Sequence, residues 1–203
     1  MPLTTGAKSS APLPPTDAKP LEYEARITLF DKVCVYRLDA NSIRAVSELG
    51  EFVYPLADIV SVRCRFFPTR VQRNRYETIL TMRTGGTLKI CNQFFKGVAD
   101  FEDRSPAYAN FVKGLHNHLA TQNPRCAFHA GTTALGFWLN ALFLGAVLLI
   151  LIVLGIIMIT AIPAVAIIKF LIILFYTPTC WCWFKRNKPR RYDPKNIPPD
   201  VLP

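Results

Sequence analysis

An almost charge-free stretch dominates the C-terminal half of the sequence. Between Thr132 and Phe184 the only Lys, Arg, Asp or Glu residue is Lys169. The apolar run from Ala134 to Tyr176 is 43 residues long. As one straight helix it measures about 65 Å, against ~30 Å for the hydrocarbon core of a bilayer. The length predicts an integral membrane protein with two passes.

Pro163 marks the expected break between these passes. Proline lacks an amide hydrogen and disfavours helix at the preceding residue, Ile162. We therefore expect a transmembrane helical hairpin over residues 132–184, with helices at about 134–159 and 164–184.

Basic residues flank both outer ends of the predicted hairpin. Lys113 and Arg125 precede it, and a second group determines topology after it: Lys185, Arg186, Lys188, Arg190 and Arg191. Cytoplasmic flanks of membrane helices are enriched in Lys and Arg. The pattern predicts a multi-pass protein with both termini in the cytoplasm.

Several residues within the apolar region carry a polar group. Four aromatic residues are typical of interfacial anchors, with packing between the helices as the alternative: Trp138, Tyr176, Trp181 and Trp183. Lys169 either meets an acidic group of a partner subunit or extends its stem toward the interface, and Asn140 has the same alternatives nearer the surface.

The remaining sequence has a different composition. The net charge of the chain is +10, of which residues 1–131 carry +5 and residues 185–203 carry +4. The basic tail adjoins an apolar span, which favours an anionic membrane surface over nucleic acid as its partner. Residues 1–20 are rich in proline and small residues and predict a disordered lead, and residues 185–203 predict an extended proline-rich tail.

Residues 21–122 have the pattern of a small α+β domain. Alternating or β-branched runs predict six or seven short strands, at 26–30, 33–38, 42–46, 52–56, 59–67, 76–83 and 87–92. Gly85-Gly86 predicts the turn between the last two. Pro106 opens a helical pattern that runs to Ala120, with one apolar stripe that packs on the sheet: Tyr108, Phe111, Val112, Leu115 and Leu119.

Two segments of this domain carry a family resemblance. Tyr54 to Val62 reads Tyr-Pro-Leu-Ala-Asp-Ile-Val-Ser-Val, and it precedes a hairpin at Tyr76–Asn92 and a final helix. This order resembles bacterial PH and GRAM-type domains of the pleckstrin-homology-like superfold, over residues 22–121. The resemblance implies a small β-barrel or sandwich capped by a C-terminal helix, and it is compatible with fusion to membrane helices. The superfold implies no single function.

An arginine run is the densest basic stretch of the domain. It is interleaved with aromatic residues and comprises Arg63, Arg65, Arg70, Arg73 and Arg75. Such a run can bind lipid phosphates, an acidic partner or RNA, or it can be a solvated face. Tethering at a bilayer favours lipid headgroups.

Cysteine, histidine and catalytic motifs point away from enzymatic chemistry. The six cysteines show no pairing pattern and predict reduced thiols, while Cys180 and Cys182 allow either inert packing or palmitoylation. His116 and His118 lie on different helix faces, so we expect no metal there, and no cofactor. The sequence contains no nucleophile elbow, phosphate loop or zinc-protease motif.

These features together predict a non-enzymatic binding or scaffold protein, with its domain at the cytoplasmic face of a bacterial inner membrane. Its expected partners are membrane lipids and a membrane protein or a second copy. One alternative is a small accessory subunit of a transporter or channel that uses Lys169 within the membrane. Nucleic-acid binding through the arginine run is the less favoured alternative.

Overall fold

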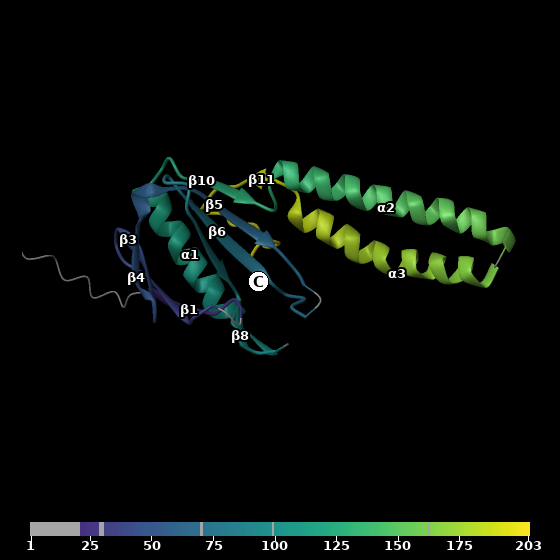
Figure 1. Cartoon of the computed structure of the whole chain (residues 1–203). Coiled ribbons are helices and arrows are strands. Elements are labelled where there is room, and N and C mark those ends of the chain that lie inside the picture. Colours follow the sequence, from purple (N-terminus) through teal and green to yellow (C-terminus); the bar gives the residue numbers. More distant parts are fainter. Residues whose placement is uncertain (1–20, 29–30, 70, 99, 162) are drawn as a thin grey trace, which may run out of the picture.

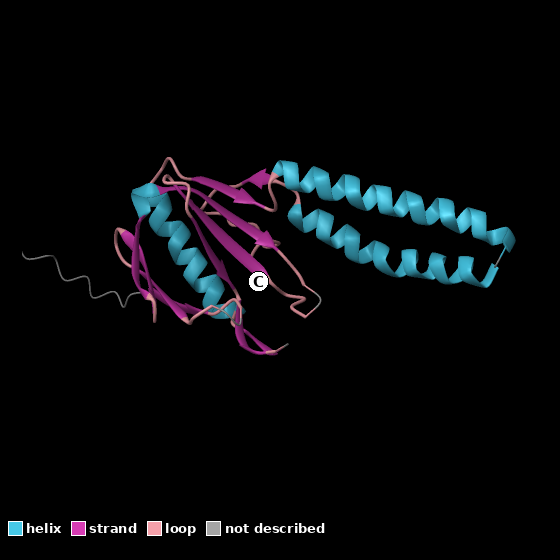
Figure 2. Cartoon of the chain, viewed as in Figure 1, coloured by secondary structure: helices cyan, strands magenta, loops and turns pink. Residues whose placement is uncertain are grey.

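The computed structural model describes residues 21–28, 31–69, 71–98, 100–161 and 163–203, except for the side chains of residues 158–170, 172, 173, 176 and 179. Within these limits the chain is a mixed α+β protein. Its strands surround one helix, and two further helices extend away from them side by side (Figures 1 and 2).

The first sheet is an antiparallel meander of four strands in sequence order. They are β1 (Leu21–Ala25), β2 (Cys34–Leu38), β3 (Ser42–Ser47) and β4 (Gly50–Pro55). The predicted first strand at 26–30 is wrong for residues 26–28, which form no strand, and residues 29 and 30 lie outside the described residues. The alternation of apolar residues begins earlier, at Leu21, and it buries Tyr23 and Ala25.

The second sheet combines a local hairpin with strands from distant parts of the sequence. A short 3-10 helix, η1 (Leu56–Asp58), leads into β5 (Ile59–Phe66), which pairs antiparallel with β6 (Tyr76–Met82), and β6 pairs with β7 (Thr87–Cys91). On the other side, β10 (Ala127–Ala130) runs parallel to β5, and β11 (Arg190–Arg191) pairs antiparallel with β10. The sheet order is therefore β11-β10-β5-β6-β7.

A third, two-stranded element joins the second sheet to the central helix. It consists of β8 (Gln93–Gly97) and β9 (Asp100–Asp103). Asp103 ends β9, and its Oδ1 accepts a hydrogen bond from the Ser105 amide at 2.9 Å. This carboxylate lies at the positive end of the following helix, where a negative charge is favourable.

The central helix α1 (Ser105–Gln122) holds the two larger sheets together. Its predicted apolar stripe is confirmed, because all five members are buried: Tyr108, Phe111, Val112, Leu115 and Leu119. They pack with inward-facing residues of both sheets, such as Ile43 and Leu80, in one core. Figure 2 shows α1 lying across the strands.

The predicted barrel is wrong. The described strands form three separate sheets, of four, five and two strands, and no closed barrel. Closure would require hydrogen bonds between the four-stranded and the five-stranded sheet. Instead β4 and β7 each pair with one strand only, and α1 fills the space between the sheets.

The predicted pair of transmembrane helices is also wrong. The sequence does form two helices, α2 (Ala134–Ala161) and α3 (Pro163–Asn187), which pack on each other. Among the described residues only α2 is long and apolar enough to cross a membrane, over the 24 residues Ala134–Ile157. In α3, Lys169 lies in the first half, and Thr177, Pro178 and Thr179 interrupt the apolar pattern before Lys185.

The C-terminal segment belongs to the domain core. Val201 and Leu202 are buried in the same cluster as α1, and Tyr192 and Ile197 pack against it. The backbone amide of Thr132, just before α2, donates to the Asn187 carbonyl at the end of α3, at 3.1 Å. The chain therefore leaves the domain and returns to it at neighbouring points.

Candidate functional site

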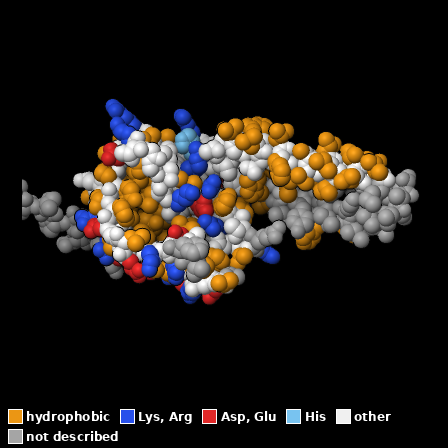
Figure 3. Space-filling model, viewed as in Figure 1, with side chains coloured by type: hydrophobic (Ala, Val, Ile, Leu, Met, Phe, Trp, Pro, Cys, Tyr) orange, Lys and Arg blue, Asp and Glu red, His pale blue; other side chains and the backbone are white. Residues whose placement is uncertain are grey.

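A partly polar cavity lies where the second sheet meets the helix pair. It is a cleft of about 560 Å³ between the outer face of β5 and β6, the first turns of α2 and the end of α3. Its walls include Arg63, Arg65, Gly136, Asn140 and Trp183. Figure 3 shows Lys and Arg side chains gathered over the sheet next to the hydrophobic surface of the helices.

Arg63 reaches this cleft because of the alternation of β5. Val62 and Cys64 point into the core with no exposed surface, so the residue between them faces outward. Its Nη1 donates to the Thr132 carbonyl at 3.0 Å, but no carboxylate pairs with it among the described residues. Burial and the neighbouring Arg65 lower the pKa of Arg63. Arg63 is therefore a half-buried cation without a counter-ion in the described chain.

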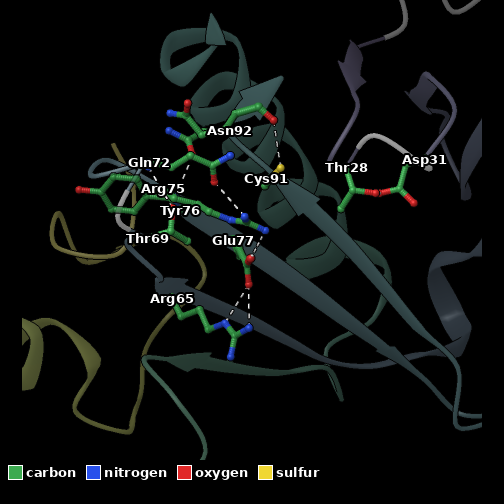
Figure 4. Close-up of polar contacts among 11 residues, drawn as sticks. Thr28, Asp31, Arg65, Thr69, Gln72, Arg75, Tyr76, Glu77, Cys91 and Asn92 are labelled. Atoms are coloured by element: carbon green, nitrogen blue, oxygen red, sulfur yellow. Dashed lines mark hydrogen bonds and ion pairs between the residues drawn. The ribbon is translucent and has the colours of Figure 1, made fainter. Parts of the chain in front are cut away.

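Arg65 and Arg75 share one buried carboxylate. Arg65 donates to Glu77 Oε2 from Nε at 3.0 Å and from Nη2 at 2.7 Å, and Arg75 Nη2 lies 2.6 Å from Glu77 Oε1 (Figure 4). The Glu77 side chain is only 6% exposed. The Phe67 ring lies 4.5 Å from the Arg65 guanidinium and 5.9 Å from that of Arg75. Both cations are held in place, and together with Glu77 they leave one positive charge in excess.

The structure thus divides the predicted arginine run. Arg63 and Arg65 line the cleft, and Arg75 approaches it through Glu77. Arg73 is exposed and lines a different cavity, and Arg70 lies outside the described residues. The five arginines do not form one patch.

The cavity that Arg73 borders is larger and mainly apolar. Its volume is about 850 Å³, and its walls include Phe66, Leu144, Phe175 and Pro178. Trp183 lines both this cavity and the basic cleft, so the two spaces adjoin at one indole ring.

The predicted interfacial aromatics divide into two groups. Trp138 and Trp181 are 69% and 67% exposed, near the ends of α2 and α3 that adjoin the domain. Trp183 instead packs parallel to Phe137, with ring centroids 6.4 Å apart, as the alternative of packing between the helices predicted. The side chain of Tyr176 lies outside the described residues.

Of the two predicted intramembrane polar residues, the structure describes the side chain of Asn140 only. The Asn140 amide donates to the Gly136 carbonyl at 2.7 Å, within its own helix, and borders the cleft. The side chain of Lys169 lies outside the description. Its proposed role in a transporter or channel assembly stays a prediction.

Two of the five basic residues after the apolar region are engaged by the domain. The Arg186 guanidinium lies 4.6 Å from the centre of the Phe66 ring and donates to the Tyr76 hydroxyl at 3.3 Å, and Arg190 forms an ion pair with Asp200. Lys185, Lys188 and Arg191 are exposed. The sequence predicted all five as topology determinants and did not indicate the contacts of Arg186 and Arg190 with the domain.

All six cysteines are free, as the sequence indicated. Cys64, Cys91 and Cys126 are buried, and burial raises the pKa of the Cys126 thiol to about 11. Cys180 and Cys182 border the apolar cavity. No group of three or more potential metal ligands occurs in the described part of the chain.

The sequence did not predict the buried polar cluster around His116. Its Nδ1 lies 2.7 Å from the Val112 carbonyl, so Nδ1 carries the proton and Nε2 accepts the hydrogen bond of the Tyr192 hydroxyl at 2.7 Å. Cys64 Sγ lies 3.4 Å from the same hydroxyl. The rings of His116 and Tyr192 stack at 5.8 Å. The only signal in the sequence is the aromatic residue in an otherwise polar, proline-rich tail.

No protein-family model matches this sequence, and neither the curated proteins nor the solved structures contain a match to it.

Proposed function

We propose that this chain is a membrane-anchored, non-enzymatic binding or scaffold protein that holds its α+β domain at the cytoplasmic face of a membrane. The observation that carries this proposal is the surface of α2. Along Ala134–Ile157 no residue is fully buried by the rest of the described protein, although α2 packs on α3. Exposed apolar residues line α2, among them Leu142, Phe143 and Leu149, and a contiguous apolar surface of this kind marks a membrane or protein interaction site.

The surroundings of α2 favour the same assignment. Its span measures about 36 Å at 1.5 Å per residue, enough for the hydrocarbon core. Trp138 lies near its start, and exposed Lys185 and Lys188 lie close to the domain at the end of α3. Aromatic rings and cations at this level match the headgroup region of a cytoplasmic leaflet.

The fold of the tail supports a position of the C-terminal segment on the same side of the membrane as the domain. Residues 190–191 pair with β10, and Val201 and Leu202 lie in the domain core. A folded domain cannot place these residues on the opposite side of a bilayer. We therefore propose that the described N-terminal residues from Leu21 onward and the C-terminal segment both lie in the cytoplasm.

A binding role fits the polar groups better than catalysis. The Cys64, His116 and Tyr192 cluster contains nucleophile and base types, but His116 and Cys64 have no exposed surface, so no substrate reaches them. The accessible polar groups are cations that border a cleft. The resemblance of residues 22–121 to PH and GRAM-type domains stays a prediction and agrees with a binding module.

Membrane extraction of the full chain tests the proposal. Wild-type protein is expected to remain with the bilayer after alkaline carbonate washing. Leu149→Arg places a charge in the middle of α2 and is expected to release a large fraction, because a central arginine costs about 2.5–3.5 kcal/mol in membrane insertion. The matched control is Leu49→Arg in the β3–β4 turn, since Leu49 is also exposed. Release of wild-type protein by carbonate would contradict membrane anchoring.

A further inference from the structure

The outer face of the second sheet carries a row of cations across neighbouring strands. In register, Arg191 of β11 pairs with His129 of β10, and His129 pairs with Arg63 of β5. The row continues through Ile79 of β6 to Lys89 of β7. Residues in register point to the same face of a sheet, with strands about 4.8 Å apart.

This row has an unfavourable energy in the described chain. His129 lies between Arg191 and Arg63, and Ile79 lies between Arg63 and Lys89, so these cations are two strand spacings apart, about 10 Å, and repel each other over that distance. Among the described residues, Arg63, Arg191 and Lys89 form no ion pair, and the nearest carboxylate on this face, Glu77, is already shared by Arg65 and Arg75. Burial and the charges of Arg63 and Arg191 lower the pKa of His129, which is consistent with crowded cations and no nearby anion. A bound anion would relieve this repulsion.

The cleft beside α2 provides the space for that anion. Arg63 and Arg65 lie on the same face of β5, two residues apart, and both line the cleft. Thr133 and Gly136, in and before the first turn of α2, form the opposite wall. The positive end of the helix dipole therefore adds to the potential of the two arginines.

The position of the cleft selects a lipid as the source of the anion. The cleft adjoins the start of α2, which the proposed function places in the bilayer, so a headgroup is the phosphate that reaches it at high local concentration. Trp183 separates it from the apolar cavity of about 850 Å³, which has room for part of a hydrocarbon chain. A polar cleft and an apolar cavity on two sides of one indole match the two ends of an amphiphile.

We propose that the cleft binds the phosphate of an anionic phospholipid, with Arg63 as the principal contact and Arg65 as the second. Arg191, Lys89 and the excess charge of the Arg65, Glu77 and Arg75 group strengthen the local potential. Free phosphate shares the same chemistry, but it lacks an apolar end for the adjoining cavity. This inference rests on the proposed membrane anchoring.

The test uses the full chain reconstituted in phosphatidylcholine vesicles, with phosphatidylglycerol as the probe. Displacement of a fluorescent phosphatidylglycerol measures its affinity. Arg63→Gln is expected to weaken binding about fivefold, the factor that corresponds to about 1 kcal/mol per basic residue near a membrane. Arg63→Lys is expected to retain most of the affinity. The matched control is Arg83→Gln, which removes the same charge from the exposed β6–β7 turn and is expected to bind like wild type.

A second variant covers the case in which Arg63→Gln fails to fold. Ser61 is two residues from Arg63 on the same face of β5 and also lines the cleft. Ser61→Asp places a competing carboxylate beside Arg63 and is expected to weaken binding at least fivefold. Equal affinities for Ser61→Asp, Arg83→Gln and wild type would overturn the proposal.

Two further outcomes separate the possible failures. Inorganic phosphate and glycerol 3-phosphate at millimolar concentrations are expected not to displace the fluorescent lipid, and complete displacement would show that the cleft prefers a soluble phosphate. If wild-type protein integrates into phosphatidylcholine vesicles but binds phosphatidylglycerol no better than the variants, only the lipid site is excluded. Failure of integration would exclude the anchoring itself.

Discussion

The hydroxyl of Tyr192 lies 2.7 Å from Nε2 of His116, so the segment after α3 is hydrogen-bonded to the helix at the centre of the domain. His116 has no exposed surface, and its other ring nitrogen bonds the Val112 carbonyl. The histidine therefore has a fixed tautomer, and Tyr192 is the closer of the two groups at Nε2, since Cys64 Sγ lies 4.0 Å from the same nitrogen. The stability of the domain depends on a residue close to the C-terminus.

Removal of this donor is expected to destabilise the domain. Tyr192→Phe leaves Nε2 of His116 buried without its closer hydrogen-bond partner, which costs about 1–3 kcal/mol of the free energy of unfolding. Denaturant unfolding followed by circular dichroism measures the loss. Tyr54→Phe is the control, because the half-buried Tyr54 hydroxyl has no hydrogen-bond partner in the described structure. Equal stability of the two variants would contradict the role of the hydrogen bond.

Acidification is expected to destabilise the domain through His116. Burial lowers the pKa of His116 from 6.5 to about 4. The unfolded chain then binds this proton more readily than the folded chain, so the free energy of unfolding falls as pH falls. The loss begins near pH 6.5, is complete near pH 4, and amounts to about 3 kcal/mol.

Urea midpoints between pH 7.5 and 4 measure this effect. The His129→Gln background removes the second histidine whose pKa is lowered. The comparison of this background with and without His116 then gives the contribution of His116 to the pH dependence of the urea midpoint. His116→Gln in the same background is expected to flatten the profile. An unchanged profile would assign the acid sensitivity to other groups.

Substitution of Gly131 is expected to disturb the junction between the domain and the helix pair. Gly131 has φ of +76°, and a Cβ there would lie 2.5 Å from the Asn187 carbonyl oxygen and 2.6 Å from that of Lys188. Gly131→Ala combines backbone strain with a clash against backbone atoms, so a loss of about 2 kcal/mol or more is expected. Gly86→Ala is the control, since its Cβ would meet nothing closer than 3.9 Å. Thermal unfolding in detergent compares the two, and a smaller effect at Gly131 would contradict the tight junction.

Loss of the buried carboxylate is expected to destabilise the second sheet. Glu77→Gln leaves the guanidinium groups of Arg65 and Arg75 close together without their shared counter-ion, which costs about 3 kcal/mol or more. The comparison is Glu22→Gln, which removes the partner of Arg37 at a half-exposed surface pair and changes stability by about 1 kcal/mol or less. Chemical unfolding of both variants measures the difference. Similar losses would mean that solvent screens the Glu77 group as well.

Local features of the fold could be predicted from the sequence. The Gly85-Gly86 turn and the 105–122 helix depend on residues that are neighbours in the chain, and the structure contains both. The apolar length of α2 is likewise a local property. The apolar length of α3 also predicted a helix, and this helix continues through Pro178.

Non-local features could not be predicted. Strand β10 has four residues and pairs in parallel with β5, and β11 has two residues and follows a long helical insertion. Neither has enough length for a periodic signal. The prolines of the tail indicated an extended peptide, but nothing local to Val201 or Leu202 shows that they fill the core.

The candidate site was predicted in part. Outward alternation along β5 places Arg63 and Arg65 on one face, which follows from the strand pattern. The engagement of Arg75 by Glu77 depends on side-chain geometry across β5 and β6, and Trp183 reaches the cleft only because α3 returns to the domain. The sequence therefore indicated basic residues but not the cavity that they border.

The return of the chain to its own domain has a consequence for biosynthesis. Val201 and Leu202 fill the core beside α1, yet the ribosome makes them after both long helices. The domain cannot finish folding until both helices and the segment after them have been made. A chain that stops at Asn187 would keep both helices but leave a gap beside His116, and this gap offers proteases a way to recognise unfinished copies.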